Sequence, residues 1–128
     1  MGGGSGSGYG FGPTSGHAFV RNLGSASKEF PLDHQNKFGT ESVGKNVQEI
    51  QSRDPLASAE KLFKMLSQGG KPVQPAPDGV KIVKFQDGTH IVFRPFSKSG
   101  SPAVDINPGT LAGKVTPQHK IHFERISS

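Results

Sequence analysis

The chain has 128 residues, contains no cysteine and no tryptophan, and carries a net charge of +5 at neutral pH. The absence of cysteine excludes a disulfide framework, a thiolate nucleophile and a cysteine-ligated zinc site. No run of 18 apolar residues occurs and the N-terminus has no apolar signal region, so the sequence predicts neither a membrane-spanning helix nor a Sec-type signal.

The N-terminal third has little regular apolar patterning. Residues 1–16 contain eight glycines, and burial cannot offset the ordering entropy of such a composition. We therefore expect a flexible Gly/Ser-rich tail or linker there. Residues 17–54 are expected to form an irregular and helical segment that wraps the domain, because the apolar positions between 17 and 40 are isolated.

A short helix is predicted within this wrapping segment. Thr40 is a suitable N-cap, and helical spacing would place Val43, Val47 and Ile50 on one side. Gly44 weakens such a helix by about 1 kcal/mol relative to alanine.

A second helix is predicted with a clear start and end. Asp54 is a good N-cap and Pro55 fits the first helical position. Apolar residues then repeat at helical spacing: Leu56, Ala59, Leu62, Phe63 and Leu66. Gly69 and Gly70 end the pattern, and we expect the apolar stripe to face the core.

After Asp78-Gly79 the apolar period changes from 3.6 to 2, which predicts a sheet. Two strand-like segments flank Asp87-Gly88, a pair favoured in the two-residue type I′ hairpin. In the register that this turn predicts, one face carries Lys81, Val83, Phe85, His90, Val92 and Arg94. The other face carries Val80, Ile82, Lys84, Ile91 and Phe93, and we expect this more apolar set to pack on the helix.

Two further strands are predicted at residues 103–107 and 120–124. Alternation in the second strand points Ile121 and Phe123 inward and His122 outward, together with a cation and a carboxylate on either side. The predicted fold class is α+β: one or two N-terminal helices packed on a small twisted antiparallel sheet, with residues 55–128 as the basic core.

The positive charge is concentrated in residues 79–128, which hold seven Lys or Arg against three Asp or Glu. Such a field attracts a polyphosphate or an acidic protein. Cleaving RNA without a metal ion requires a base for the 2′-OH, an acid for the leaving oxygen, and cations or hydroxyls for the phosphorane. The catalytic candidates are His90, Arg94, His119 and His122. The substrate-binding candidates are Lys81, Ser97, Lys98, Ser99, Thr116 and Lys120.

Plainer interpretations exist for each of these residues. A single exposed histidine on a strand is more often a solvated surface residue, and a Ser/Gly turn explains the serines around Gly100 nearly as well as a phosphate contact does. A metal site is the weaker interpretation, because alternation would point His119 and His122 to opposite faces and no carboxylate pair lies nearby. We expect neither a metal ion nor another cofactor.

Several short runs resemble a family of secreted toxins. These runs are Asp87-Gly88-Thr89, Arg94-Pro95-Phe96-Ser97, Ser99-Gly100-Ser101-Pro102, Asp105-Ile106 and Lys120-Ile121-His122-Phe123. They look like the C-terminal toxin domains of bacterial polymorphic toxins and contact-dependent inhibition effectors, and they resemble the tRNA-cleaving domains of colicin-like bacteriocins. The resemblance covers roughly residues 55 to 126.

The resemblance implies a barnase/EndoU/colicin/RelE-like fold, in which the open face of an antiparallel sheet holds RNA. It implies a metal-independent endoribonuclease, often directed at tRNA, that is secreted and acts in the cytoplasm of a target bacterium. It also implies a cognate acidic immunity protein in the producing cell. Two alternatives stay open: a non-catalytic module that binds RNA or protein, and a metal-dependent DNase toxin delivered by the same route.

Overall fold

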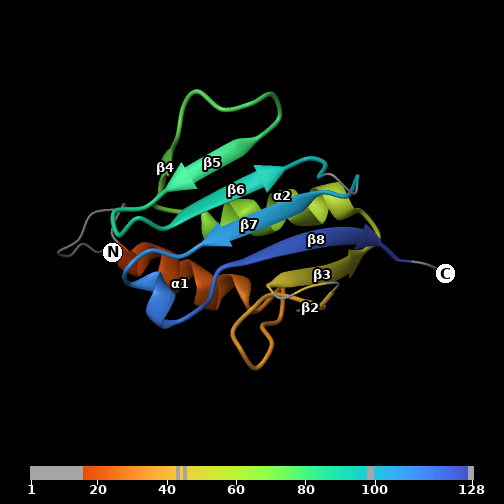
Figure 1. The fold of residues 1–128 in the computed structure, drawn as a ribbon, viewed down its shortest axis with the longest axis horizontal. Helices are drawn as coiled ribbons and strands as arrows, with labels where there is room; N and C mark the ends of the chain where they lie inside the picture. The colour runs from red at the N-terminus through yellow and green to blue at the C-terminus, as the bar shows by residue number, and fades with distance from the viewer. Residues whose placement is uncertain (1–15, 43, 45, 98–99, 127–128) are drawn as a thin grey trace.

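The structure, a computed structural model, describes residues 16–42, 44, 46–97 and 100–126. The predictions for residues 1–15, Val43, Lys98 and Ser99 lie outside this part of the chain. The described residues form two α-helices and a seven-stranded sheet, which confirms the α+β class (Figure 1). In chain order the elements are α1 (Gly16–Ala26), β2 (Thr40–Glu41), β3 (Val47–Ser52), α2 (Pro55–Leu66), β4 (Lys71–Pro72), β5 (Lys81–Lys84), β6 (His90–Arg94), β7 (Ala103–Asn107), the 3₁₀ turn η1 (Ala112–Lys114) and β8 (His119–Arg125).

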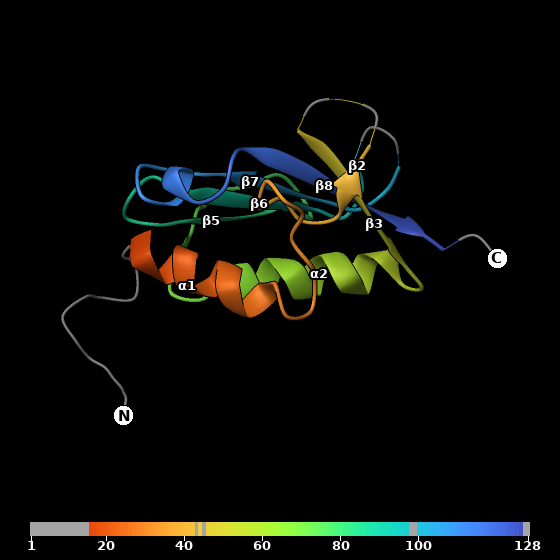
Figure 2. The same ribbon diagram turned by 90° about the horizontal axis from the view of Figure 1, so that it is seen from below.

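The sheet is mixed, and its strand order is β2-β3-β8-β7-β6-β5-β4. Strand β3 pairs with β8 in parallel, whereas the other neighbours are antiparallel. The prediction of a small, purely antiparallel sheet was therefore wrong in both size and strand direction. Both α-helices lie on the same side of the sheet (Figure 2). We call the opposite side the open face, because within the described residues neither helix covers it.

Helix α1 replaces the irregular segment predicted after residue 16. Phe19, Asn22, Leu23 and Ala26 recur at helical spacing on its buried side. The Asn22 amide donates to the carbonyl oxygens of Leu66 and Gln68 at 2.9 and 2.7 Å, which ties α1 to the end of α2. The pattern was missed because one of its four positions is a polar residue and another is alanine.

Helix α2 confirms the helix predicted from Asp54 onward. The Asp54 side chain accepts a hydrogen bond from the Ala57 backbone N–H at 3.1 Å, and Pro55 occupies the first turn. The buried positions are Ala59, Leu62, Phe63 and Leu66, as expected, whereas Leu56 is 43% exposed.

Strands β2 and β3 stand where the short helix after Thr40 was predicted, so that prediction was wrong. Asn46 has a φ of +66°, in the left-handed region, and its carbonyl accepts from the Lys120 N–H at 2.9 Å. From there Val47 to Ser52 pair with β8 over six residues. This long-range pairing outweighs a local helical preference that Gly44 already weakens.

The hairpin between β5 and β6 forms, but its register differs by one residue from the predicted one. The Phe85 N–H donates to the Thr89 carbonyl, so the loop has three residues, and Gly88 has a φ of +95°. Lys81 consequently opposes Phe93 rather than Arg94. Its ammonium lies 5.7 Å from the centre of the Phe93 ring, on the helix-covered side of the sheet.

The slip exchanges the two faces of β5 but leaves those of β6 as predicted. Val83 and Phe85, expected on the open face, are buried in the core, and Lys84 takes the open face opposite His90. Ile91 and Phe93 pack toward the helices, as predicted. In β8, Ile121 and Phe123 are fully buried, which confirms the predicted alternation.

Candidate functional site

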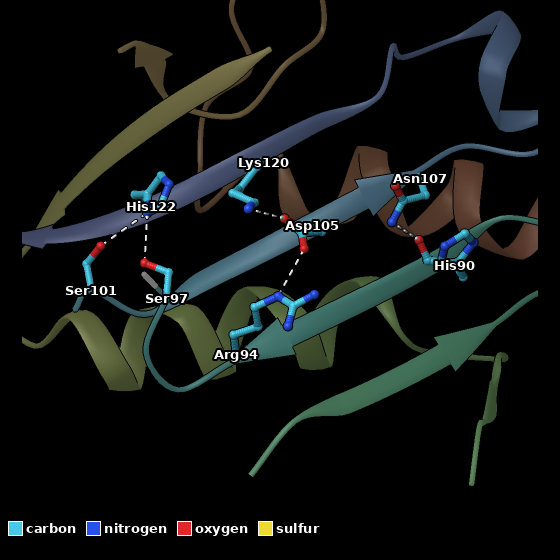
Figure 3. A network of polar contacts seen from close by, with 8 residues as sticks. All are labelled: His90, Arg94, Ser97, Ser101, Asp105, Asn107, Lys120 and His122. Carbon is cyan, nitrogen blue, oxygen red and sulfur yellow. Dashed lines mark hydrogen bonds and ion pairs between the residues drawn. The ribbon is translucent and has the colours of Figure 1, made fainter. Parts of the chain in front are cut away.

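The candidate site lies on the open face where β6, β7 and β8 run side by side (Figure 3). His122 of β8 opposes Ala103 of β7, which in turn opposes Arg94 of β6. In the neighbouring row, Lys120 opposes Asp105. Residues in one row share a face, so the pairing brings an imidazole, two cations and a carboxylate together.

Two hydroxyl groups hold the His122 ring. The Nδ1 atom lies 3.1 Å from Ser101 Oγ and 3.4 Å from Ser97 Oγ. Both serines belong to a tight turn in which the Ser97 N–H donates to the Ser101 carbonyl and Gly100 adopts a φ of +92°. Within the described residues Nε2 makes no hydrogen bond, so this nitrogen is the one available to exchange a proton with a ligand.

Asp105 lies between the two cations of the site. Its Oδ2 atom is 3.3 Å from Arg94 Nε, and its Oδ1 atom is 3.9 Å from Lys120 Nζ. The Asp105 side chain is 11% exposed, whereas those of Arg94 and Lys120 are 42% and 38% exposed. Oδ1 is buried and makes no hydrogen bond with the described residues. The carboxylate therefore anchors two cations that still reach solvent.

This arrangement suits chemistry on a phosphate. Arg94 and Lys120 carry two positive charges against one on Asp105, so these three side chains keep a net positive charge on the β7 side of His122. Glu49 on the β3 side of His122 and Glu124 further along β8 place carboxylates on the same face. Guanidinium and ammonium groups stabilise negative charge that develops on phosphoryl oxygens. An imidazole accepts or donates a proton near neutral pH.

His90 shares the open face but not this cluster. Its Nδ1 atom lies 3.4 Å from the Gly88 carbonyl, and its own carbonyl accepts from the Asn107 amide at 3.4 Å. His90 and Arg94 are four residues apart in one strand, which corresponds to about 13 Å. Figure 3 shows His90 at the far end of the face from His122.

His119 and Thr116 lie in the interior, whereas both are predicted from the sequence to belong to the site. His119 begins β8 and points inward like Ile121, and it is fully buried. Burial lowers its pKa below the usual value, and Lys37 lowers it further, against opposing effects of Pro117 and Asp33. The Thr116 hydroxyl donates to the Asn36 carbonyl at 2.6 Å. Both side chains hold the fold together rather than face the open side.

Two residues of the cluster were missed by sequence reasoning. Asp105 was quoted only for the resemblance, yet a charged residue in the middle of an otherwise apolar strand is itself a signal of a polar face. The sequence alone does not indicate Ser101, because its contact with His122 depends on the turn that follows β6. The aromatic residue expected on the open face, Phe85, is buried, whereas Phe96, next to Ser97, is 71% exposed.

Comparisons of the chain with protein-family models, with curated proteins and with solved structures found no significant match. Among the residues that the structure describes, no three His, Asp or Glu side chains form a group able to hold a metal ion. In the same part of the chain, neither helix has the length and apolar character needed to cross a membrane.

Proposed function

We propose that this protein is a metal-independent endoribonuclease with a barnase/EndoU/colicin/RelE-like fold. One observation carries the proposal: a hydroxyl-held His122 shares the uncovered sheet face with two cations that are anchored on a single buried carboxylate. The concentration of positive charge in residues 79–128 supports a polyanionic substrate.

Each residue of the cluster has a distinct role in this proposal. The 2′-OH of RNA attacks the adjacent phosphorus and loses its proton, the 5′-oxygen leaves and gains one, and a 2′,3′-cyclic phosphate results. His122 takes the 2′-OH proton on Nε2 and then delivers it to the departing 5′-oxygen, while Ser97 and Ser101 fix the ring through Nδ1. Arg94 and Lys120 stabilise the dianionic phosphorane. Asp105 is a positioning residue, because it holds both cations but is itself shielded from solvent.

The biological setting is proposed from the resemblance described above. The protein acts as a secreted antibacterial toxin that cleaves tRNA in the cytoplasm of a target bacterium, and an acidic immunity protein neutralises it in the producing cell. The positive field of residues 79–128 suits both the RNA and an acidic inhibitor.

The decisive experiment incubates purified protein with total bacterial tRNA in excess EDTA and resolves the products on a denaturing gel. We expect discrete fragments with 2′,3′-cyclic phosphate ends. His122→Ala and Arg94→Ala should each reduce cleavage by about 100-fold or more, as for removal of a general acid–base or an electrostatic group. His34→Ala is the matched control, because it removes an exposed histidine from the loop before β2.

The other outcomes are equally informative. Intact tRNA that is retained by the protein would indicate a non-catalytic binding module. Cleavage that appears only with added divalent ions, and acts on DNA, would indicate a metal-dependent DNase. Full activity of both the His122 and the Arg94 variants would refute the assignment of this site.

A further inference from the structure

A second basic feature lies on the open face, at the opposite edge of the sheet from β3. Lys71 of β4 and Lys84 of β5 stand directly opposite each other, and both are exposed. Like charges at such positions repel and destabilise a strand pair. Among the described residues neither lysine forms an ion pair, so the repulsion is not neutralised within this part of the chain.

The two lysines also border a pocket of about 440 Å³. Its lining consists of Lys71, Pro72, Val73, Lys84, Phe85 and Gln86. The volume falls within the range of small-molecule sites in proteins. On the other side of Lys84, across the strand pair, stands His90, which adds a further group able to contact an anion. The row of Lys71, Lys84 and His90 thus offers two ammonium groups and an imidazole beside this pocket.

Charge is distributed unevenly across the open face. Strands β3 and β8 place Glu49 and Glu124 on this face, in register with His122 and its neighbours. The open-face positions of β4, β5 and β6 hold no carboxylate, and they include Lys71 and Lys84. A polyanion bound at the His122 cluster is therefore repelled by the β3 side of the face and attracted toward β4.

The spacing of the two basic features fits a nucleic acid strand rather than one phosphate group. Lys84 opposes His90 across one strand spacing of about 4.8 Å, and Arg94 lies four residues, about 13 Å, further along β6, so the backbones at Lys84 and Arg94 are about 14 Å apart. That distance corresponds to roughly four nucleotides of a stacked strand, which rises about 3.4 Å per nucleotide. A single RNA strand therefore reaches both features at once, with several nucleotides between them.

We propose that Lys71 and Lys84 form a second phosphate subsite, which holds the RNA strand several nucleotides away from the bond that is cleaved. This inference deepens the proposed ribonuclease function and rests on it for the position of the cleaved bond. The subsite contributes to substrate binding and to the choice of long substrates, whereas the proton transfers remain at His122.

The test compares two double variants that remove the same charge. Lys71→Gln with Lys84→Gln removes the subsite, and Lys28→Gln with Lys64→Gln removes two exposed lysines from the helical side of the molecule. The first readout is binding of a fluorescent 2′-O-methyl oligonucleotide, which cannot be cleaved, over a series of salt concentrations. The second readout is kcat/KM for an RNA oligonucleotide and for a dinucleotide that is too short to reach the subsite.

Loss of two phosphate contacts should lower the slope of log affinity against log salt by about 1.4, at about 0.7 per contact with a single strand. For the subsite variant we also expect kcat/KM on the oligonucleotide to fall at least several-fold while that on the dinucleotide stays unchanged. The control variant should match the wild type in both readouts. An unchanged salt slope, or an equal loss in the control variant, would overturn the subsite.

Binding and cleavage keep the two proposals separable. A wild-type protein that binds the oligonucleotide with the lysine-dependent slope but cleaves neither substrate would refute the ribonuclease function and support the subsite. If the wild-type protein cleaves both substrates and the subsite variant behaves identically, the ribonuclease function is supported and the subsite is refuted.

Discussion

Mild acid should destabilise this protein through His119. The ring is fully buried, and both of its nitrogens have partners: Nδ1 lies 2.8 Å from the Pro117 carbonyl, and the Phe38 N–H donates to Nε2 at 3.2 Å. One neutral tautomer, with the proton on Nδ1, satisfies both contacts. A proton added to Nε2 removes the acceptor for Phe38 and places a charge in the core.

The lowered pKa of His119 determines how the free energy of unfolding changes with pH. Burial lowers the pKa of His119 below 6.5, the usual value that the unfolded chain retains. As pH falls below 6.5 the unfolded state therefore binds more protons than the folded state. The free energy of unfolding then decreases by up to about 1.4 kcal/mol per pH unit, until the folded pKa is passed. Above pH 6.5 the full stability is present.

Urea denaturation between pH 7.5 and 5.0 measures this loss, and His119→Gln is the matched variant. The glutamine side chain does not titrate, and its carbonyl oxygen can accept from the Phe38 N–H. We expect the wild type to lose stability relative to the variant, by up to about 1.4 kcal/mol between pH 6.5 and 5.5. Asp33 and Asp87 do not contribute in this range. Although burial opposes the shift, hydrogen bonds lower both carboxyl pKa values below 3.8.

Parallel stability profiles for the wild type and His119→Gln would refute this reasoning. An NMR titration of wild-type His119 provides an independent check, because a midpoint at or above pH 6.5 would contradict the argument from burial.

Three further predictions concern single substitutions. Asp87→Ala removes the acceptor of the Thr89 N–H and hydroxyl within the β5–β6 loop and of the Leu111 and Ala112 N–H groups after β7, so urea denaturation should show a loss of about 3 kcal/mol. Gly109→Ala would place a Cβ atom 2.2 Å from the Asp87 carbonyl oxygen, and a fall of several degrees in the thermal midpoint is expected. Ser101→Ala frees one side of the His122 ring, so single-turnover cleavage should slow by about 10-fold while the circular dichroism spectrum stays unchanged.

Sequence reasoning succeeded where a local signal agrees with the tertiary structure. The Asp54 cap and the apolar stripe of α2 are both local, and both are present as predicted. The alternation in β8 likewise placed His122 outward and Phe123 inward. These two elements position the helix layer and one edge of the candidate site.

It failed where a distant partner decides the structure. Val47 to Ile50 form a strand because β8 lies beside them, yet β8 begins about seventy residues later. Gln48 is fully buried in that strand, and its amide donates to the Asp33 side chain and to the Phe38 carbonyl. A buried glutamine disrupts the apolar pattern from which a strand is usually recognised.

The hairpin shows how a small local error propagates. Asp87-Gly88 indicates a turn, but it does not distinguish a two-residue loop from the three-residue loop that forms. The difference of one residue moves Lys81 to the helix-covered side of the sheet and brings Lys84 to the open face. Ser97 and Ser101 were equally hard to assign, because their contact with His122 depends on a turn between two strands.

The place of β8 in the sheet affects how the protein is made. Strand β8, the last in chain order among the described residues, lies between β3 and β7, and it carries both His122 and Lys120. A nascent chain in which β8 is not yet available has β2 and β3 on one side and β4 to β7 on the other, with no strand to pair the two groups. The domain therefore cannot complete its sheet, or assemble the His122 cluster, until β8 has emerged from the ribosome. Completion of the sheet and assembly of the candidate site are consequently coupled in time.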